Sequence, residues 1–151
     1  MSVQRLERVQ RIARPRDEVF AFFERAENLE RITPAFLRFS IVTPLPIEMR
    51  EGATIDYRLS LFGVPLRWRT RIDRYEPRDS FVDMQVRGPY RLWRHTHTFE
   101  DVEGGTEMRD VVEYEVPFGP LGTLARWLFV SRTLERIFDH RAASIAEIFE
   151  A

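Results

Sequence analysis

The sequence predicts an α+β fold: a strongly curved antiparallel sheet of about six to seven strands, with one long C-terminal helix across its concave face. Residues 36–117 alternate between apolar and polar side chains with a period of two, which is typical of half-buried strands. Two short helical segments precede this region, and roughly the last thirty residues form an amphipathic helical pattern. A chain of 151 residues is the size of one domain, so we expect a single domain over residues 1–151.

Composition excludes several classes of function. Hydrophobic residues make up 44% and charged residues 31%, a globular balance, and the net charge of −1 gives no overall attraction to nucleic acid. The absence of cysteine excludes disulfides, thiolate catalysis and cysteine-based metal sites. No apolar stretch approaches about 18 residues, and the first residues do not resemble a signal peptide. We therefore expect a cytoplasmic protein with no stable membrane insertion.

The N-terminal segment contains the first strand and both short helices. Residues 3–12 have apolar side chains three apart, which suits a helix as well as a strand. Because the helices that follow need a surface to pack on, we predict a strand. Pro15 then marks the first turn of one helix, Asn28 is expected to cap a second, and Pro34 ends it.

The remaining strands are predicted from alternation and from the turns between them. Around the turn at Gly63, the apolar face carries Ile55, Tyr57, Leu59 and Leu61, and then Leu66, Trp68, Thr70 and Ile72. Further strands are predicted at residues 36–43, 80–87, 91–102 and 106–116.

The C-terminal helix has one continuous apolar stripe and an unusually apolar start. The stripe contains Trp127, Val130, Leu134, Ile137, Phe138, Ile145 and Phe149. Between residues 117 and 130, apolar side chains surround most of the helix, which indicates a lid, a contact in a homodimer or a transient membrane contact. Alternatively, the loops near residues 44–50 and 62–65 cover this end.

Two histidines form the most informative polar motif. His95 and His97 lie two apart on a predicted strand, so they share a face with Trp93 and Phe99. On the next strand, Asp110 shares the corresponding inward face. The sequence therefore predicts a buried cluster of two imidazoles and a carboxylate.

The preceding strand admits two arrangements. Either the face with Val82 and Met84 is buried, or the face with Asp83 and Gln85 is. An odd number of residues in the loop at 88–90 places Asp83 opposite His97 and Gln85 opposite His95. We favour this second arrangement because buried histidines need hydrogen-bond partners.

Several segments resemble the START-like superfamily, also called SRPBCC or helix-grip proteins, and in particular a small bacterial ligand-binding branch. The segments are residues 13–20, 81–85, 88–90, 93–99, 114–119 and 121–122, together with Asp110. The resemblance implies a cavity between the sheet and the C-terminal helix that holds a hydrophobic or amphipathic small molecule, such as a lipid, a quinone or a polyketide-like compound.

The residues and the resemblance together give a ranked set of functions. A ligand-binding protein comes first, and a cyclase or dehydratase without cofactor comes second, with His95, His97 and Asp110 as its candidate acid–base residues. A ribosome- or protein-interaction module comes third, and the balanced charge disfavours it. We expect the ligand to contact Tyr57, Leu59, Trp68, Asp83, Gln85, Trp93, His95, His97, Phe99, Asp110, Val112, Tyr114, Leu134 and Phe138.

Two further interpretations of the polar cluster remain open. A buried network that satisfies its own hydrogen bonds would only fix the register of the sheet. Two histidines on one strand and a carboxylate can also make a three-ligand metal site, but this pattern arises easily by chance. The sequence therefore assigns no metal ligand and no cofactor.

Overall fold

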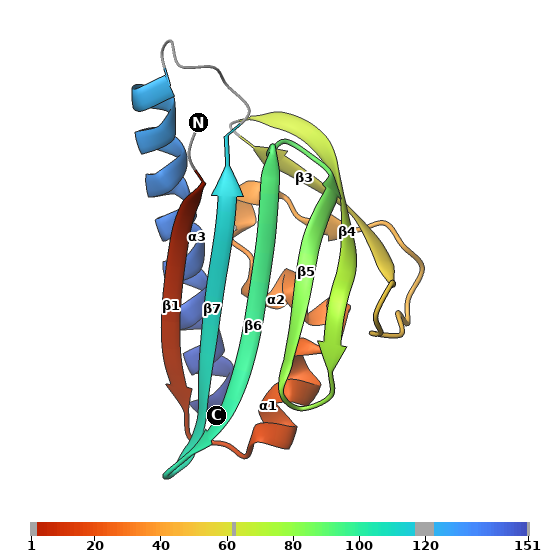
Figure 1. Cartoon of the computed structure of the whole chain (residues 1–151), viewed down its shortest axis with the longest axis vertical. Helices are drawn as coiled ribbons and strands as arrows, with labels where there is room; N and C mark the ends of the chain where they lie inside the picture. Colours follow the sequence, from red (N-terminus) through yellow and green to blue (C-terminus); the bar gives the residue numbers. More distant parts are fainter. Residues whose placement is uncertain (1–2, 62, 117–122, 151) are drawn as a thin grey trace.

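The computed structural model describes residues 3–61, 63–116 and 123–150. In this part of the chain, seven strands form one antiparallel sheet in the order β1-β7-β6-β5-β4-β3-β2 (Figure 1). The strands are β1 (Gln4–Ile12), β2 (Ser40–Ile41), β3 (Thr54–Leu61), β4 (Val64–Glu76), β5 (Ser80–Arg87), β6 (Leu92–Val102) and β7 (Gly105–Glu115). The helices are α1 (Arg16–Phe23), α2 (Leu29–Ile32) and α3 (Thr123–Glu150), with single 3-10 turns η1 (Ala26–Asn28) and η2 (Ala35–Leu37).

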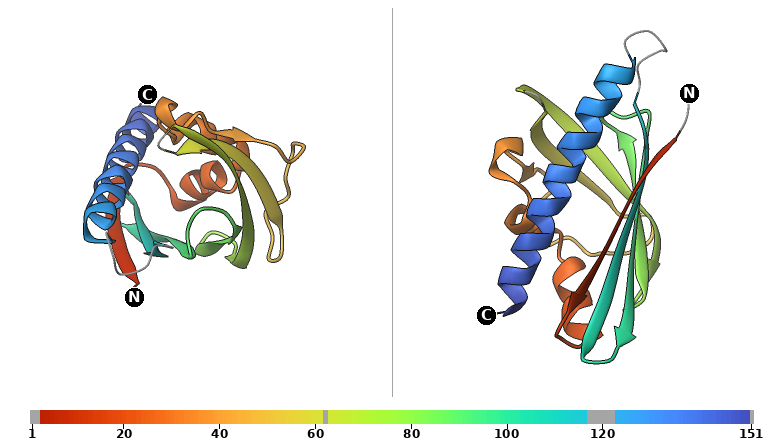
Figure 2. Two further views of the ribbon diagram at one scale, coloured as in Figure 1. Left: turned by 90° about the horizontal axis from the view of Figure 1, so that it is seen from above. Right: turned by 90° about the vertical axis from the view of Figure 1, so that its left-hand side faces the viewer.

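The sheet curls so that helices close its open side. Figure 2 shows α3 running alongside the concave face, with α1 and α2 filling the space between α3 and the sheet. Two irregularities in the pairing of β4 with β5, at Arg69/Thr70 and at Ile72/Arg74, contribute to this bend. The predicted α+β helix-grip architecture is confirmed.

The apolar core falls into three groups. One packs α1 and the end of α3 on the sheet and includes Phe20, Phe23, Phe81, Phe99 and Ile145. A second lies under the first half of α3 and includes Val112, Tyr114, Val130, Leu134 and Phe138. A third, around Ile55 and Tyr57, lies between β3, β4 and the short helices. The space between the second and third groups is where a cavity forms.

The predicted strand at residues 3–12 is confirmed, since β1 pairs with β7 along its whole length. Pro15 precedes α1, and α2 lies where the sequence places it, between Asn28 and Thr33. Asn28 stands at the N-cap position of α2, as predicted, but its side chain makes no capping hydrogen bond there. Its side-chain amide donates to the carbonyl oxygen of Phe22 at 2.9 Å and holds the end of α1 instead.

The predicted strand at 36–43 is mostly wrong. Residues Ala35–Leu37 form a turn of 3-10 helix, and Arg38 follows in the left-handed conformation, with φ of 47°. Ser40 and Ile41 pair with β3, and the N–H of Val42 donates to the carbonyl oxygen of Asp56 on that strand. The reversal at Arg38 shortens the strand, because an extended chain cannot continue through a left-handed residue.

Two other expectations concern the start of α3. The loop at 117–122, where a lid is predicted, lies outside the described residues, and so do the side chains of residues 123–127. Within the described part, Leu128 and Phe129 are exposed, the latter to 57%, so the loops near residues 44–50 and 63–65 do not cover them. Among the described helices, none has the length and apolar character needed to cross a membrane.

Candidate functional site

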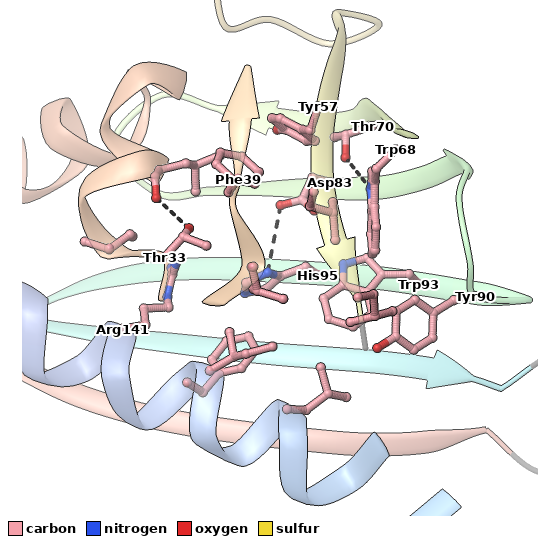
Figure 3. Close-up of a pocket in the computed structure, with 18 of the residues that line it drawn as sticks. Thr33, Phe39, Tyr57, Trp68, Thr70, Asp83, Tyr90, Trp93, His95 and Arg141 are labelled. Carbon is pink, nitrogen blue, oxygen red and sulfur yellow. Dashed lines mark hydrogen bonds and ion pairs between the residues drawn. The ribbon is translucent and has the colours of Figure 1, made fainter. Parts of the chain in front are cut away.

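A cavity of about 180 Å³ lies between the concave face of the sheet and helices α2 and α3 (Figure 3). Its walls are mostly aliphatic and aromatic, with a few polar groups, as in sites that bind small organic molecules. The lining residues are Leu29, Ile32, Thr33, Leu37, Phe39, Tyr57, Leu59, Leu61, Trp68, Thr70, Asp83, Tyr90, Trp93, His95, His97, Leu134, Ile137, Phe138 and Arg141.

Three aromatic rings form one end of the cavity. Trp68 and Trp93 meet edge to face, with ring centroids 5.3 Å apart, and Tyr90 lies 4.9 Å from Trp93 (Figure 3). The indole Nε1–H of Trp68 donates to the hydroxyl of Thr70 at 3.0 Å. Because these rings hold one another in place, this end of the cavity is a preformed aromatic surface.

The polar residues come from adjacent strands of the sheet. Asp83 on β5 lies opposite His95 on β6, and Phe81 lies opposite His97. Asp83 therefore faces the cavity, as in the favoured arrangement, but the predicted pairing of Asp83 with His97 is wrong by two residues. The shift leaves the face unchanged, because side chains alternate with a period of two.

The shifted pairing still allows a diagonal hydrogen bond. Nε2 of His97 lies 2.6 Å from Oδ2 of Asp83, and the His97 ring stacks on Phe81 with centroids 4.1 Å apart. His97 is thus held between an aromatic ring and a carboxylate. This fixes its orientation toward the cavity wall.

Asp110 on β7 joins the two histidines to a cation on α3. Its Oδ1 lies 2.8 Å from Nε2 of His95, 3.3 Å from Nδ1 of His97 and 3.2 Å from Nη2 of Arg141. Asp110, His95, His97 and Arg141 are each at most 7% exposed, whereas the Asp83 side chain is 20% exposed. Asp83 is therefore the most accessible charge of the cluster.

Arg141 is the charged member of the cluster that sequence reasoning missed. It occupies the apolar stripe of α3 between Phe138 and Ile145, and an arginine at a position that the helical period buries was the available signal. Its guanidinium carbon lies 5.3 Å from the ring centroid of Phe23. Among the described residues, its buried Nε has no hydrogen-bond partner.

Both carboxylates remain ionised despite burial. Burial alone would raise the pKa of Asp110, but the charge of Arg141 and the hydrogen bonds from His95 and His97 hold that pKa well below its ordinary value of 3.8. Burial opposes ionisation of Asp83 in the same way. The hydrogen bond from His97 and the charges of the histidines and of Arg141 nevertheless lower the pKa of Asp83.

The two histidines have opposite pKa shifts. Burial and the positive charge of His97 lower the pKa of His95. Burial also opposes the charge of His97, but its contacts with Asp110 and Asp83 outweigh it and raise the pKa of His97. The cluster is therefore electrically balanced when Asp83 and Asp110 are ionised, Arg141 and His97 are charged and His95 is neutral.

A neutral His95 leaves an acceptor at the cavity. A neutral imidazole has one N–H and one lone pair. Since Asp110 accepts at 2.8 Å, we assign the proton of His95 to Nε2, which leaves the lone pair on Nδ1, 4.0 Å from Oδ2 of Asp83. The cavity thus meets a carboxylate and an imidazole lone pair side by side.

Nine of the fourteen residues predicted to contact a ligand line the cavity. They are Tyr57, Leu59, Trp68, Asp83, Trp93, His95, His97, Leu134 and Phe138. Half of the ten lining residues that sequence reasoning missed come from α2 and the segment after it, namely Leu29, Ile32, Thr33, Leu37 and Phe39. Their apolar character was visible, but their position over the sheet was not.

Five predicted contacts do not line this cavity, and each has a packing reason. Phe99 packs against Phe20 and Phe23 of α1, and α3 covers Val112 and Tyr114. Asp110 lies behind the histidines, and Gln85 turns aside to make two hydrogen bonds with the backbone of Tyr90. The sequence predicted which face of the sheet these residues lie on. It did not predict which parts of that face α1 and α3 cover.

The same cluster contains the donor atoms of a possible cation site. Asp83, His95 and His97 each offer one ligand atom, and these atoms lie within 4.8 Å of one another. Two imidazole nitrogens and one carboxylate oxygen suit zinc and similar transition metals.

Comparisons with solved structures show the same fold. The Zhui aromatase/cyclase from Streptomyces sp. R1128 aligns with a TM-score of 0.76 and 15% identity, covering 99% of this chain and 94% of that one. The di-domain aromatase/cyclase StfQ of the steffimycin biosynthetic pathway aligns with a TM-score of 0.73 and 15% identity, covering 98% of this chain and 51% of that one. A nucleoside-diphosphate sugar epimerase from Corynebacterium glutamicum is 26% identical, with a TM-score of 0.68, covering 94% of this chain but 28% of that one.

The sequence comparisons add the family. Comparison with curated proteins gave no match. Residues 12–140 match the family described as "Polyketide cyclase / dehydrase and lipid transport", which is most of the chain. This match and the aromatase/cyclase neighbours confirm the START-like resemblance, and the chain belongs to the polyketide cyclase/dehydrase and lipid transport family.

Proposed function

We propose that the protein binds a small amphipathic molecule that carries an aromatic or polyketide-like ring and at least one hydroxyl group. The observation that carries this proposal is the cavity itself, which joins an aromatic end to a buried cluster of hydrogen-bonding groups. Membership of a family whose description includes polyketide cyclases and lipid transport supports a ligand of this class.

The size of the cavity limits the ligand. About 180 Å³ is close to the ~150 Å³ of a cavity that holds benzene, and below the roughly 300–1,000 Å³ of many drug-binding pockets. A compound of one or two rings, or one ring system of a larger molecule, fits this space. Trp68 and Trp93 offer it their ring surfaces.

The polar groups favour a hydroxyl over a quinone. Asp83 and Nδ1 of His95 accept hydrogen bonds, whereas a quinone has only acceptors and would leave both without a donor. A hydroxyl group donates to either of them. A neighbouring carbonyl on the ligand can accept from Arg141, whose Nε lacks a partner among the described residues.

Calorimetric titration with β-naphthol and β-naphthyl methyl ether tests this proposal. We expect β-naphthol to bind at least tenfold more tightly, because only its hydroxyl can donate to Asp83. Equal affinities, or no binding of either compound, would contradict the proposal.

A matched pair of variants tests whether binding occurs in the cavity. Leu59→Trp places an indole in the cavity wall and should abolish binding, whereas Val9→Trp places one on the exposed side of β1 and should leave it unchanged. Loss of binding in both variants, or in neither, would argue against the cavity as the site.

A second candidate function is dehydration of a bound β-hydroxy ketone. The observation that favours it is the pairing of a carboxylate at the cavity, Asp83, with the charged imidazole of His97, 2.6 Å away. The carboxylate of Asp83 is able to remove the proton next to the carbonyl, while the charged imidazole of His97 protonates the departing hydroxyl. Asp110 does not line the cavity, so in this account it positions the histidines.

The aldol adduct of benzaldehyde and acetone is a suitable substrate, because its dehydration product is a conjugated enone that absorbs in the near ultraviolet. We expect dehydration above the buffer rate that Asp83→Asn removes and that His140→Gln, an exposed control on α3, retains. A rate equal to that of buffer would exclude this function for simple β-hydroxy ketones.

A further inference from the structure

We propose that Asp83, His95 and His97 form a binding site for a divalent transition metal in the cavity wall, with Asp110 orienting His95 and Phe81 stacked on His97. Zinc and cobalt are the metals best suited to this donor set. The inference does not depend on the organic ligand proposed above, because it rests on the arrangement of the side chains alone.

The donor atoms match the chemistry of such ions. Zinc binds imidazole nitrogen and carboxylate oxygen at about 2.0–2.2 Å, so tetrahedral ligand atoms lie about 3.3 Å apart. Oδ2 of Asp83 lies 2.6 Å from Nε2 of His97 and 4.0 Å from Nδ1 of His95, and these distances bracket that spacing. All three ligand atoms lie within 4.8 Å of one another, so the side chains must shift to reach this spacing.

Asp110 supplies the support that metal-binding histidines need. Such histidines usually direct their second ring nitrogen at a carboxylate or carbonyl, which fixes the ring and its tautomer. Here Oδ1 of Asp110 makes a hydrogen bond of 2.8 Å with Nε2 of His95, whereas Nδ1 of His97 lies 3.3 Å from the same oxygen without hydrogen-bond geometry. The other nitrogen of each ring is the one that lies near Asp83.

The remaining contacts hold this support in place. Arg141 lies 3.2 Å from the same oxygen of Asp110 and balances its charge. The two imidazoles stack with centroids 3.7 Å apart, and Phe81 stacks on His97 from the other side. The ring orientations are therefore fixed before any metal binds, which reduces the cost of assembling the site.

All three proposed ligands face the cavity. Asp83, His95 and His97 line the cavity, while Asp110 lies behind them. Three protein ligands with one open position is the arrangement of catalytic zinc sites, in which a water or a substrate oxygen occupies the fourth position. Across the described part of the chain, no other group of three such side chains has this spacing.

Calorimetric titration of chelator-treated protein with Zn²⁺ alone tests the proposal. We expect one ion per chain, and Co²⁺ should give the visible absorption of a four-coordinate site with nitrogen and oxygen ligands. Weak uptake of several ions per chain, or no uptake, would overturn the proposal.

Variants identify the ligands. Asp83→Ala and His95→Ala should abolish stoichiometric binding, and Asp110→Asn should weaken it about 10–100-fold. His140→Ala, which removes an exposed histidine, should bind as the wild type does. Circular dichroism checks that each variant is folded, and Asp83→Ala is the most informative because its side chain is the least buried. Unchanged binding in folded Asp83→Ala would overturn the site, whereas β-naphthol binding to metal-free wild type reports on the organic ligand separately.

Discussion

His95 and His97 stack with ring centroids 3.7 Å apart and planes 23° apart, yet their pKa values shift in opposite directions. The difference follows from their contacts. Two carboxylates lie within 3.3 Å of the His97 nitrogens, so His97 holds a proton more firmly, and its charge then disfavours a second one on His95. The pair therefore carries a single positive charge over the range between the two pKa values.

Proton–nitrogen correlation spectra of metal-free protein provide the first test. We expect His97 to titrate above the ordinary histidine pKa of 6.5 and His95 below it. At neutral pH, His95 should show the pattern of a neutral ring protonated on Nε2. Equal pKa values, or the reverse order, would contradict the assigned network.

The stability of metal-free protein should depend on pH through His97. Since its pKa is raised on folding, its contribution to the free energy of unfolding is complete below pH 6.5 and is lost as the pH rises through the folded pKa. Urea denaturation of the wild type and of His97→Gln should therefore give a difference in stability that shrinks as the pH rises. A constant difference would show that the pKa of His97 is not raised in the folded protein.

Asp110 should contribute far more to stability than an exposed acid that pairs with arginine. Asp110→Ala leaves Arg141 buried without its partner, and breaking a buried ion pair costs about 3–5 kcal/mol. Asp56→Ala breaks an exposed pair with Arg69 and should cost less than ~1 kcal/mol. Urea denaturation measures both values, and similar losses would contradict the idea that the buried network stabilises the fold.

Gln85 should act on the cavity through the loop that carries Tyr90. Its side-chain amide donates to the carbonyl oxygen of Tyr90 at 2.7 Å and accepts from the Tyr90 N–H at 3.0 Å. Gln85→Ala should cost about 1–3 kcal/mol and weaken β-naphthol binding several-fold. Gly88→Ala should have a similar effect, because its Cβ would lie 2.6 Å from Oε1 of Gln85.

Gln10, whose side chain also hydrogen-bonds to a backbone carbonyl, supplies the control for Gln85→Ala. Gln10 donates to the carbonyl oxygen of Ala142 at 2.9 Å and does not line the cavity. Gln10→Ala should reduce stability without changing affinity. Equal loss of affinity in Gln10→Ala and Gln85→Ala would show that the effect is not local to the cavity.

The sequence predicted the architecture because periodicity determines which faces are buried. The alternation through His95 and His97 and through Asp110 gave the correct inward faces, and the helical period of α3 gave its apolar stripe. The left-handed residue Arg38 interrupted a strand whose side-chain pattern alone looked continuous.

The site was harder to predict, because it depends on how strands and helices are placed against each other. The offset of two residues between β5 and β6 places Phe81, not Asp83, directly opposite His97 on the neighbouring strand, without changing any face. Arg141 was overlooked because its partner, Asp110, lies on another element and 31 positions earlier in the chain. Side-chain pattern reports burial, but not which buried charges meet.

The central claim is that a hydroxylated aromatic molecule binds between the tryptophan pair and the Asp83 cluster. Proton–nitrogen spectra recorded during a β-naphthol titration test it most directly, with indole signals assigned through Trp68→Phe and Trp93→Phe. The account predicts saturable shifts of the Trp68 and Trp93 indole N–H signals together with those of His95. Shifts confined to the outer face of the sheet, or no saturable shifts at all, would contradict it.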